Sequence, residues 1–122
     1  MRLKRSRLKW YSHRKAVPYK DNEGSSGIEY GPPSSFMAEV WPAGGKVQAE
    51  MYGQRLTHIY NCRIQGKYQT HIENGIVHYD FDTFSIAETD GICLFVPPES
   101  DPDYRVISIH PYTPLYLEME KI

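Results

Sequence analysis

Hydrophobic and polar positions alternate in two stretches near the middle of the chain, and a stretch without alternation separates them. Between Phe36 and Trp41, and again between His58 and Ile64, the residues alternate with a period of two. This period is typical of half-buried β-strands. Pro42 and Gly44-Gly45 end the first stretch, because neither residue type sustains regular strand pairing. The pattern therefore predicts two strands joined by a long connection.

The connection has the composition of a short helix rather than of a flexible linker. Lys46 to Met51 are rich in helix-tolerant residues, and Gly53 follows where such a helix would end in a left-handed cap. Long connections in compact all-β domains are usually functional or disordered. Disorder does not suit the apolar residues of this one, which are Val47, Met51, Tyr52 and Leu56. We therefore predict that residues 42–56 form an ordered loop that carries a short helix and projects.

Further strand and turn signals lie on both sides of this centre. Lys9 to Val17 predict a first strand, in which the apolar positions are Trp10, Tyr11 and Val17. Asp21 to Ser35 are rich in turn residues and predict a loop around the short segment Ile28-Glu29-Tyr30. Asn74-Gly75 fits the two-residue turn of a β-hairpin between strands at 67–73 and 76–81.

Three more strands are expected in the last third of the chain. Ile92 to Val96 are apolar on both faces, which favours a central strand. Tyr104 to His110 alternate, with Val106 on one face and Ile107 and Ile109 on the other. The last strand places Leu115, Leu117 and Met119 on one face and Tyr116, Glu118 and Glu120 on the other.

These elements predict an all-β fold in one domain spanning residues 1–122. Strands this short, with frequent turn signals, favour a small antiparallel β-barrel or sandwich of about six to eight strands. The long loop with its short helix is the one exception to the β pattern. A chain of 122 residues is long enough for a single core.

The charge is distributed unevenly along the chain. Residues 1–20 contain eight Lys or Arg and no acidic residue, whereas the remainder contains six basic and 15 acidic residues. A basic segment of this kind suits an anionic partner, such as nucleic acid, a membrane surface or an acidic patch on a protein. A solvated basic first strand explains the composition equally well. The candidate contacts with such a partner are Arg2, Lys4, Arg5, Arg7, Lys9, Arg14 and Lys15.

The sequence indicates a protein that is made and kept in the cytoplasm. No run approaches the roughly 20 apolar residues of a membrane-spanning helix. The basic N-terminus lacks the apolar region of a secretory signal, so we expect no membrane partner. Cys62 and Cys93 both lie in predicted strands among apolar neighbours. The sequence leaves a disulfide between them open, but two buried reduced thiols are the simpler interpretation.

Residue patterns that would indicate catalysis or metal binding are weak. The five histidines are scattered without the spacing of HxxxH or HExxH motifs. His71 and His78 flank the predicted hairpin and could face each other, which favours a cross-strand polar pair over a zinc site. An acidic cluster lacks the glycine and spacing of a calcium loop; its members are Asp80, Asp82, Glu88 and Asp90. No nucleophile, phosphate-loop or dinucleotide motif is present, so we expect no enzyme, no metal and no cofactor.

Several segments of the chain together resemble a family of phage proteins. They are the run VWPAGGKVQAEMYGQRL, the basic LKRSRLKWYSHRK before it, and DGICLF and PDYRVISI after it. In these segments the chain is similar to the small head closure proteins of tailed bacteriophages, also called head–tail joining or stopper proteins. The most specific parts are AEVWPAGGKVQAEMYG, Asp90-Gly91-Ile92 and Pro102–Val106.

The resemblance implies a β-barrel subunit that forms a homo-oligomeric ring below the portal and joins the DNA-filled head to the tail. It implies three further partners: the portal or adaptor ring, the tail-completion proteins and the packaged double-stranded DNA. It also implies a location in the neck of the virion, and in the host cytoplasm during assembly. In that family a long inter-strand loop points into the channel and helps to retain the packaged DNA.

Residues 42–56 match the position of that loop. The candidate channel-loop and inter-subunit residues are Pro42, Gly44, Gly45, Lys46, Val47, Gln48, Met51, Tyr52, Gly53 and Arg55. The competing interpretation is that the turn of helix covers one end of the barrel. The loop sets Lys46 and Arg55 against Glu50, so we expect it to plug a channel by shape rather than by binding phosphates tightly.

Two other functions remain open from the sequence. One is a small OB-like barrel that binds single-stranded nucleic acid with the basic segment and surface aromatics such as Trp10, Tyr11 and Trp41. The other is a different ring component of the neck or tail that has no channel-closing role.

Overall fold

The structure is a computed structural model that describes residues 7–20, 22–24 and 26–122. Arg2, Lys4 and Arg5, three of the candidate contacts, lie outside the described residues. The described part of the chain is an all-β fold with one short α-helix and one 3₁₀-helix, as the sequence predicts.

Six antiparallel strands close into a barrel. In order around the barrel they are β1 (Lys9–Arg14), β4 (Ser34–Pro42), β5 (Ile59–Ile64), β11 (Leu115–Lys121), β10 (Tyr104–His110) and β9 (Gly91–Cys93). The barrel is complete because β9 pairs with β1 through Ser12 and Cys93. Closure removes much of the unpaired strand edge on which another chain could add a strand, although β9 pairs with β10 only at Tyr104 and Arg105.

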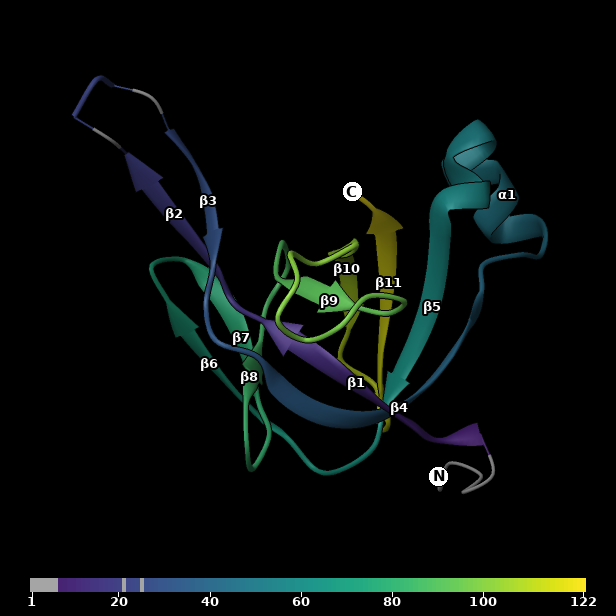
Figure 1. Ribbon diagram of the computed structural model, residues 1–122. Coiled ribbons are helices and arrows are strands. Elements are labelled where there is room, and N and C mark those ends of the chain that lie inside the picture. Colours follow the sequence, from purple (N-terminus) through teal and green to yellow (C-terminus); the bar gives the residue numbers. More distant parts are fainter. Residues whose placement is uncertain (1–6, 21, 25) are drawn as a thin grey trace.

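The other elements are attached to this barrel on different sides (Figure 1). β2 (Ala16–Lys20) and β3 (Ser26–Tyr30) form a hairpin that extends away from it. β6 (Gln69–Glu73), β7 (Ile76–Asp80) and β8 (Ser85–Ile86) form a three-stranded sheet beside it. On the opposite side in Figure 1, α1 (Lys46–Tyr52) and the 3₁₀-helix η2 (Gly53–His58) connect β4 to β5.

The core fills the barrel with the inward-facing residues of its strands. Ile64, Leu115, Leu117 and Met119 are completely buried, as the alternation in β5 and β11 predicts. Burying one such side chain contributes about 1.5–3 kcal/mol. Tyr79 and Ile86 of the three-stranded sheet belong to the same core. The sheet is therefore part of the folded domain and not a loose appendage.

The central stretch contains β4, α1 and β5 as the sequence predicts. The sequence does not predict η2, which separates α1 from β5 and includes His58, a residue expected in the strand. Gly53 ends the helix with a φ of 55° and a ψ of −125°, which is a positive φ but not the predicted left-handed cap. The turn at Asn74-Gly75 is also confirmed. Asn74 has a φ of 53° and Gly75 a φ of 78°, the left-handed pair that a tight two-residue hairpin requires.

The prediction of one strand from Lys9 to Val17 is wrong, and so is the loop predicted at 21–35. The chain leaves the barrel after Arg14, and β2 pairs with β3 inside the predicted loop. Both strands of this hairpin are mostly exposed, with Val17 at 44% and Ile28 at 48%. Because neither strand has a buried face, no alternation marks them in the sequence.

The predicted central strand from Ile92 to Val96 is too long. β9 ends at Cys93, and Phe95 is 67% exposed. The carboxylate of Asp103 accepts hydrogen bonds from the backbone N–H groups of Leu94 (2.8 Å) and Phe95 (3.0 Å). These bonds replace the strand pairing that the backbone would otherwise need.

The simple alternation predicted in β10 is interrupted by a bulge. The register with β11 shifts between Val106 and Ser108, and both Val106 and Ile109 are buried. An extra residue in one strand changes the side to which later side chains point. In β11, Glu118 lies on the outer face as predicted, yet only 2% of it is exposed.

Candidate functional site

Residues 42–56 form an ordered projection from the barrel, which we call the projecting segment. Figure 1 shows its helix standing clear of the barrel strands. None of the residues in α1 or η2 is buried. The segment begins at Pro42, the exposed last residue of β4. A helix of seven residues has too few hydrogen bonds to be stable alone in water, so other contacts must hold it.

Glycines set both ends of the helix. Gly45 precedes it with a φ of 84° and Gly53 follows it with a φ of 55°, values that strain other residue types. A Cβ at either position, or at Gly44, would meet no atom within 4 Å. The glycines at 45 and 53 are therefore needed for the backbone conformation and not for close packing.

One polar side chain of the helix, that of Gln48, is hydrogen-bonded to the outer face of the barrel. Its Nε2 donates to Asn61 Oδ1 (2.6 Å) and to Glu118 Oε2 (2.8 Å). Its Oε1 accepts the backbone N–H of Gly44 at 3.0 Å. Tyr116 donates its hydroxyl proton to Asn61 Oδ1 at 2.8 Å. The side chain thus links the start of the segment to β5 and β11.

This group extends to β10 and gives a polar cluster in which two members are buried and three are half-buried. Nε2 of His110 lies 3.1 Å from Glu118 Oε1, opposite the oxygen that contacts Gln48. We call Gln48, Asn61, His110, Tyr116 and Glu118 the Gln48 cluster. Burial, with the Glu118 carboxylate nearby, raises the pKa of Tyr116 to about 12. Burial and the same carboxylate, which accepts a hydrogen bond from Tyr52, raise the pKa of Tyr52 to about 12.

An ion pair holds the far end of the projecting segment. Nε and Nη2 of Arg55 donate to the two carboxylate oxygens of Glu120 at 2.7 and 2.8 Å. The guanidinium also lies 5.6 Å from the centre of the Tyr52 ring. The hydrogen bonds to Glu120 raise the pKa of Arg55 and lower that of Glu120. The charge of Arg55 is therefore engaged inside the subunit, whereas Lys46 and Glu50 are exposed.

Two apolar side chains of the helix point into solvent. Val47 is 70% exposed and Met51 is 60% exposed. They are four residues apart and so lie on one face of the helix. The competing interpretation places Val47, Met51 and Tyr52 over an open barrel end, and the exposure of Val47 and Met51 does not fit it. Tyr52 is half-buried because it packs toward Glu118 and Arg55.

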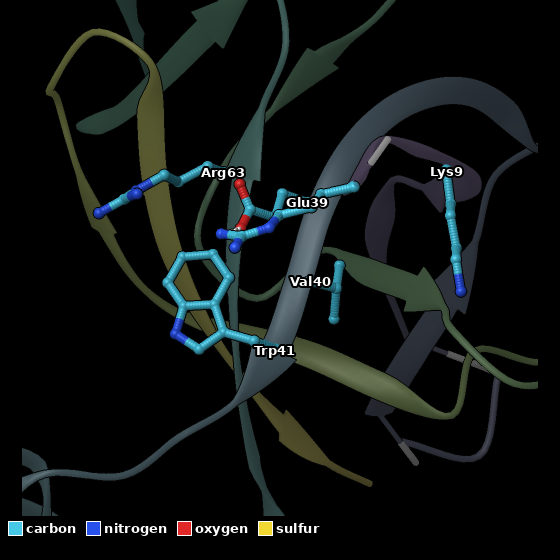
Figure 2. A pocket seen from close by; sticks show the side chains of 6 residues that line it. Lys9, Glu39, Val40, Trp41 and Arg63 are labelled. Carbon is cyan, nitrogen blue, oxygen red and sulfur yellow. Dashed lines mark hydrogen bonds and ion pairs between the residues drawn. The ribbon is translucent and has the colours of Figure 1, made fainter. Parts of the chain in front are cut away.

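The described residues of the basic segment have different environments. Arg7 contacts Glu39 at 3.4 Å and, with Lys9 and Arg63, lines an open hollow on the outside of the barrel. Figure 2 shows Lys9 extending away from Arg63 on the far side of Val40. The Arg63 guanidinium lies 5.1 Å from the centre of the Trp41 ring. These cations border one surface but do not converge on one point.

Arg14, unlike Arg7, makes hydrogen bonds that hold parts of the subunit together. Its guanidinium donates to the backbone carbonyl oxygens of Gly31 (2.7 Å), Ser100 (2.8 Å) and Tyr30 (3.1 Å). These bonds connect the barrel to the β2–β3 hairpin and to the loop before β10. Lys15, the next residue, is exposed. Of this neighbouring pair, only Lys15 is available to a partner.

The sequence analysis does not predict the buried pair of His13 and Asp90, which joins distant parts of the chain. Nε2 of His13 lies 2.7 Å from Asp90 Oδ2, and both side chains are almost fully buried. Asp90 also accepts the backbone N–H groups of Ala16 and Ala87, each at 3.0 Å. Asp90, one member of the predicted acidic cluster, therefore has a structural role. A separation of 77 residues leaves no local signal for this pair.

The cysteines are both free and buried. Burial raises the pKa of each thiol. Protonated thiols are poor nucleophiles and poor metal ligands, so neither side chain resembles a reactive cysteine. This arrangement agrees with the simpler of the two interpretations of the sequence.

Together these features define a closed antiparallel β-barrel protein with a helix-bearing projection on one side. Comparisons of the chain with protein-family models, with curated proteins and with solved structures found no match. Neither helix in the described residues has the length and apolar character needed to cross a membrane.

Proposed function

We propose that this chain is a structural subunit of the neck of a tailed bacteriophage. In this proposal it forms a homo-oligomeric ring below the portal, closes the DNA channel after packaging and joins the head to the tail. The proposal starts from the resemblance of VWPAGGKVQAEMYGQRL and its flanking segments to head closure proteins. The observation that carries it is the projecting segment, whose helix buries none of its residues.

The construction of the projecting segment supports this role. Its backbone is held at one end by Gln48 and at the other by Arg55, so the helix keeps its position without contributing to the core. The exposed pair Val47 and Met51 then faces outward. In a ring, copies of this helix from neighbouring subunits would pack these apolar side chains against one another and narrow the lumen.

The charges of the segment favour closure by shape. The ion pair with Glu120 occupies Arg55, and the exposed Lys46 is offset by the exposed Glu50. Tight binding to a DNA backbone requires several cations that neutralise phosphates. The packaged double-stranded DNA is therefore held back by a constriction rather than by strong phosphate contacts.

The basic segment supplies the contact with another ring. Arg7 and Lys9 border the open hollow on the outer barrel surface, and Lys15 is exposed. We expect these cations to dock on an acidic surface of the portal or adaptor ring, or of a tail-completion protein. The subunit would then reside in the virion neck, after assembly in the host cytoplasm.

Shortening the projecting segment tests the channel-closing role. The last residues of β4 and the first of β5 are paired, with Pro42 opposite Tyr60 and the Ala43 N–H bonded to the Ile59 carbonyl at 3.0 Å. A tight turn can therefore replace residues 45–52. We expect the variant to fold and assemble, because the barrel core is untouched. Heads should fill with DNA and lose it before tails attach, measured as DNA retained per head.

A substitution in the intact segment separates the apolar contact from the loop itself. Changing Val47 and Met51 together to Ser should also reduce DNA retention. The matched control is Ile72→Ser, since Ile72 is 72% exposed on a different part of the surface. Heads that retain DNA as well as the parent would remove the channel-closing role and leave a ring component of another kind. A shortened protein that unfolds would instead make the segment a support of the barrel.

One observation favours a second function, the binding of single-stranded nucleic acid. Arg7, Lys9 and Arg63 line the same hollow as Trp41, which combines cations with an aromatic surface. Stacking on aromatic rings along a basic groove is the usual mode of such binding. The two functions differ in a simple assay. A connector subunit binds a portal ring, whereas a nucleic-acid-binding barrel binds oligonucleotides with an affinity that falls steeply with salt.

A further inference from the structure

The β6–β7 hairpin lies on the other side of the barrel from α1 (Figure 1). It brings two histidines and a glutamate together. His71 and His78 are directly opposite each other in the strand register, and their rings stack with centroids 4.9 Å apart. Glu73 is two residues after His71, on the same face of β6. One potential ligand atom from each of the three residues lies within 4.8 Å of the other two.

The individual distances converge on the Glu73 carboxylate. Its Oε2 lies 3.7 Å from Nε2 of His71 and 4.0 Å from Nε2 of His78. Ligand atoms around a tetrahedral zinc ion are roughly 3.3–3.5 Å apart, given bond lengths of about 2.0–2.2 Å. The Glu73 and His71 side chains are 60% and 47% exposed, so both are free to close this gap, while the His78 side chain is only 11% exposed.

A second carboxylate orients His71 for binding. Nδ1 of His71 lies 2.5 Å from Asp80 Oδ2, and the Ser85 hydroxyl donates to the other oxygen of Asp80 at 2.6 Å. A proton on Nδ1 that is donated to Asp80 leaves the lone pair of a neutral imidazole on Nε2, which faces Glu73. Metal-binding histidines are commonly held by a carboxylate in this way, which fixes the tautomer and the ring orientation.

The sequence favours a polar pair without metal at His71 and His78; from the geometry of the three side chains we propose instead that His71, Glu73 and His78 bind a divalent transition-metal ion of the zinc class. Two imidazoles and one carboxylate suit Zn²⁺ and leave a fourth position open to water or to a donor from another molecule. The ion would link β6 to β7 near the turn. Every residue of β6 is exposed, so few packing contacts hold its side chains in positions that would prevent metal binding. The site is independent of the proposed neck function.

Calorimetric titration of the untagged chain of residues 1–122 with Zn²⁺ tests the site. The titration is run at about pH 8, because protons compete with metals for imidazole nitrogens. We expect one ion per chain. Glu73→Gln and His71→Asn change exposed side chains, so both variants should fold and bind Zn²⁺ at least about tenfold more weakly. The matched control is His58→Asn, since His58 is also exposed but lies on η2; its affinity should equal that of the parent.

Asp80→Asn tests the positioning role of the second carboxylate. Zn²⁺ affinity should fall about 10–100-fold. In the metal-free variant, ¹⁵N NMR should show His71 losing its preference for a proton on Nδ1, a change that a purely structural role for Asp80 would not produce. Unchanged affinity and an unchanged tautomer would remove Asp80 from the site.

The absorption spectrum of the Co²⁺-loaded protein identifies the type of ligand. Nitrogen and oxygen ligands should give d–d bands without a thiolate charge-transfer band. A thiolate band would place the ion on Cys62 or Cys93 and overturn the proposal. It is also overturned if the parent binds no Zn²⁺, or if Glu73→Gln and His71→Asn bind as tightly as the parent and His58→Asn.

Discussion

The projecting segment and the β6–β7–β8 sheet both extend from the barrel, but they are held in different ways. Side-chain hydrogen bonds from Gln48 and Arg55 to the barrel surface hold the projecting segment in place. Apolar packing holds the three-stranded sheet, because its residues Tyr79 and Ile86 belong to the main core. The comparison indicates that the sheet contributes to the core, whereas the helix does not.

Aromatic packing makes the attachment of the sheet stronger still. The rings of Phe81 and Phe84 stack with centroids 5.1 Å apart, and Phe84 stacks in turn on Phe36 of β4 at 5.3 Å. Tyr68 packs edge-on against Tyr79. In the helix, by contrast, Val47 and Met51 face solvent. The two regions should therefore respond differently to loss of an apolar side chain.

The largest expected effect is that of Ile86→Ala in β8. Ile86 is completely buried, so the substitution removes apolar contacts and leaves a cavity. The free energy of unfolding should fall by about 2–5 kcal/mol, measured by urea denaturation. The matched change is Val47→Ala in the exposed helix, which should alter stability by no more than about 0.5 kcal/mol. Equal losses in the two variants would contradict the distinction between the regions.

A smaller effect is expected for Gln48→Ala. The substitution removes the hydrogen bond to the buried Glu118, which costs about 1–3 kcal/mol, whereas Asn61 Oδ1 keeps the hydrogen bond from Tyr116. Because the contact holds only the helix, amide hydrogen exchange should accelerate in α1 and remain slow in β5 and β11. Gln54→Ala changes an exposed glutamine on η2 and serves as the control. Faster exchange throughout the barrel would show that the helix is part of the cooperative core.

The smallest effect concerns the ion pair at the end of the segment. Hydrogen bonds from Arg55 lower the pKa of Glu120 below its ordinary value of 4.5. A carboxylate with a lower pKa in the folded state stabilises the protein above its unfolded pKa, and this contribution is lost as pH falls through the folded value. Arg55→Gln should therefore raise the pKa of Glu120, as followed by NMR, and reduce stability at neutral pH but not in acid.

Arg105→Gln is the control for that titration. Arg105 lies 3.6 Å from the same carboxylate and makes the weaker contact, so its removal should shift the pKa of Glu120 less. A larger shift in Arg105→Gln than in Arg55→Gln would mean that the projecting segment is not held by Glu120.

The best predictions from the sequence concern elements with one buried face. Alternation in β4 and β5 marks strands because Ala38, Cys62 and Ile64 enter the core while their neighbours do not. The β2–β3 hairpin has no buried face and gives no such pattern. In β10 the bulge shifts the pattern by one residue, and only the partner strand reveals that shift.

The candidate site was predictable in its position and not in its contacts. Glycines at 44–45 and 53 around helix-forming residues indicate the projecting segment, because caps and turns depend on local backbone conformation. The role of Gln48 depends on Asn61 and Glu118, which are 13 and 70 residues away. The sequence around a polar residue in a short exposed helix does not indicate such distant partners.

The sequence by itself determined the all-β class, the helix-bearing connection and the turn at Asn74-Gly75, since each depends on neighbouring residues. Only the tertiary structure decided that the strands close into a barrel and that His13 is buried beside Asp90. It also decided that Glu118, on the outer face of β11, is covered by Gln48. These outcomes depend on contacts between residues far apart in the chain, and the physical chemistry of one segment does not specify which distant segment will meet it.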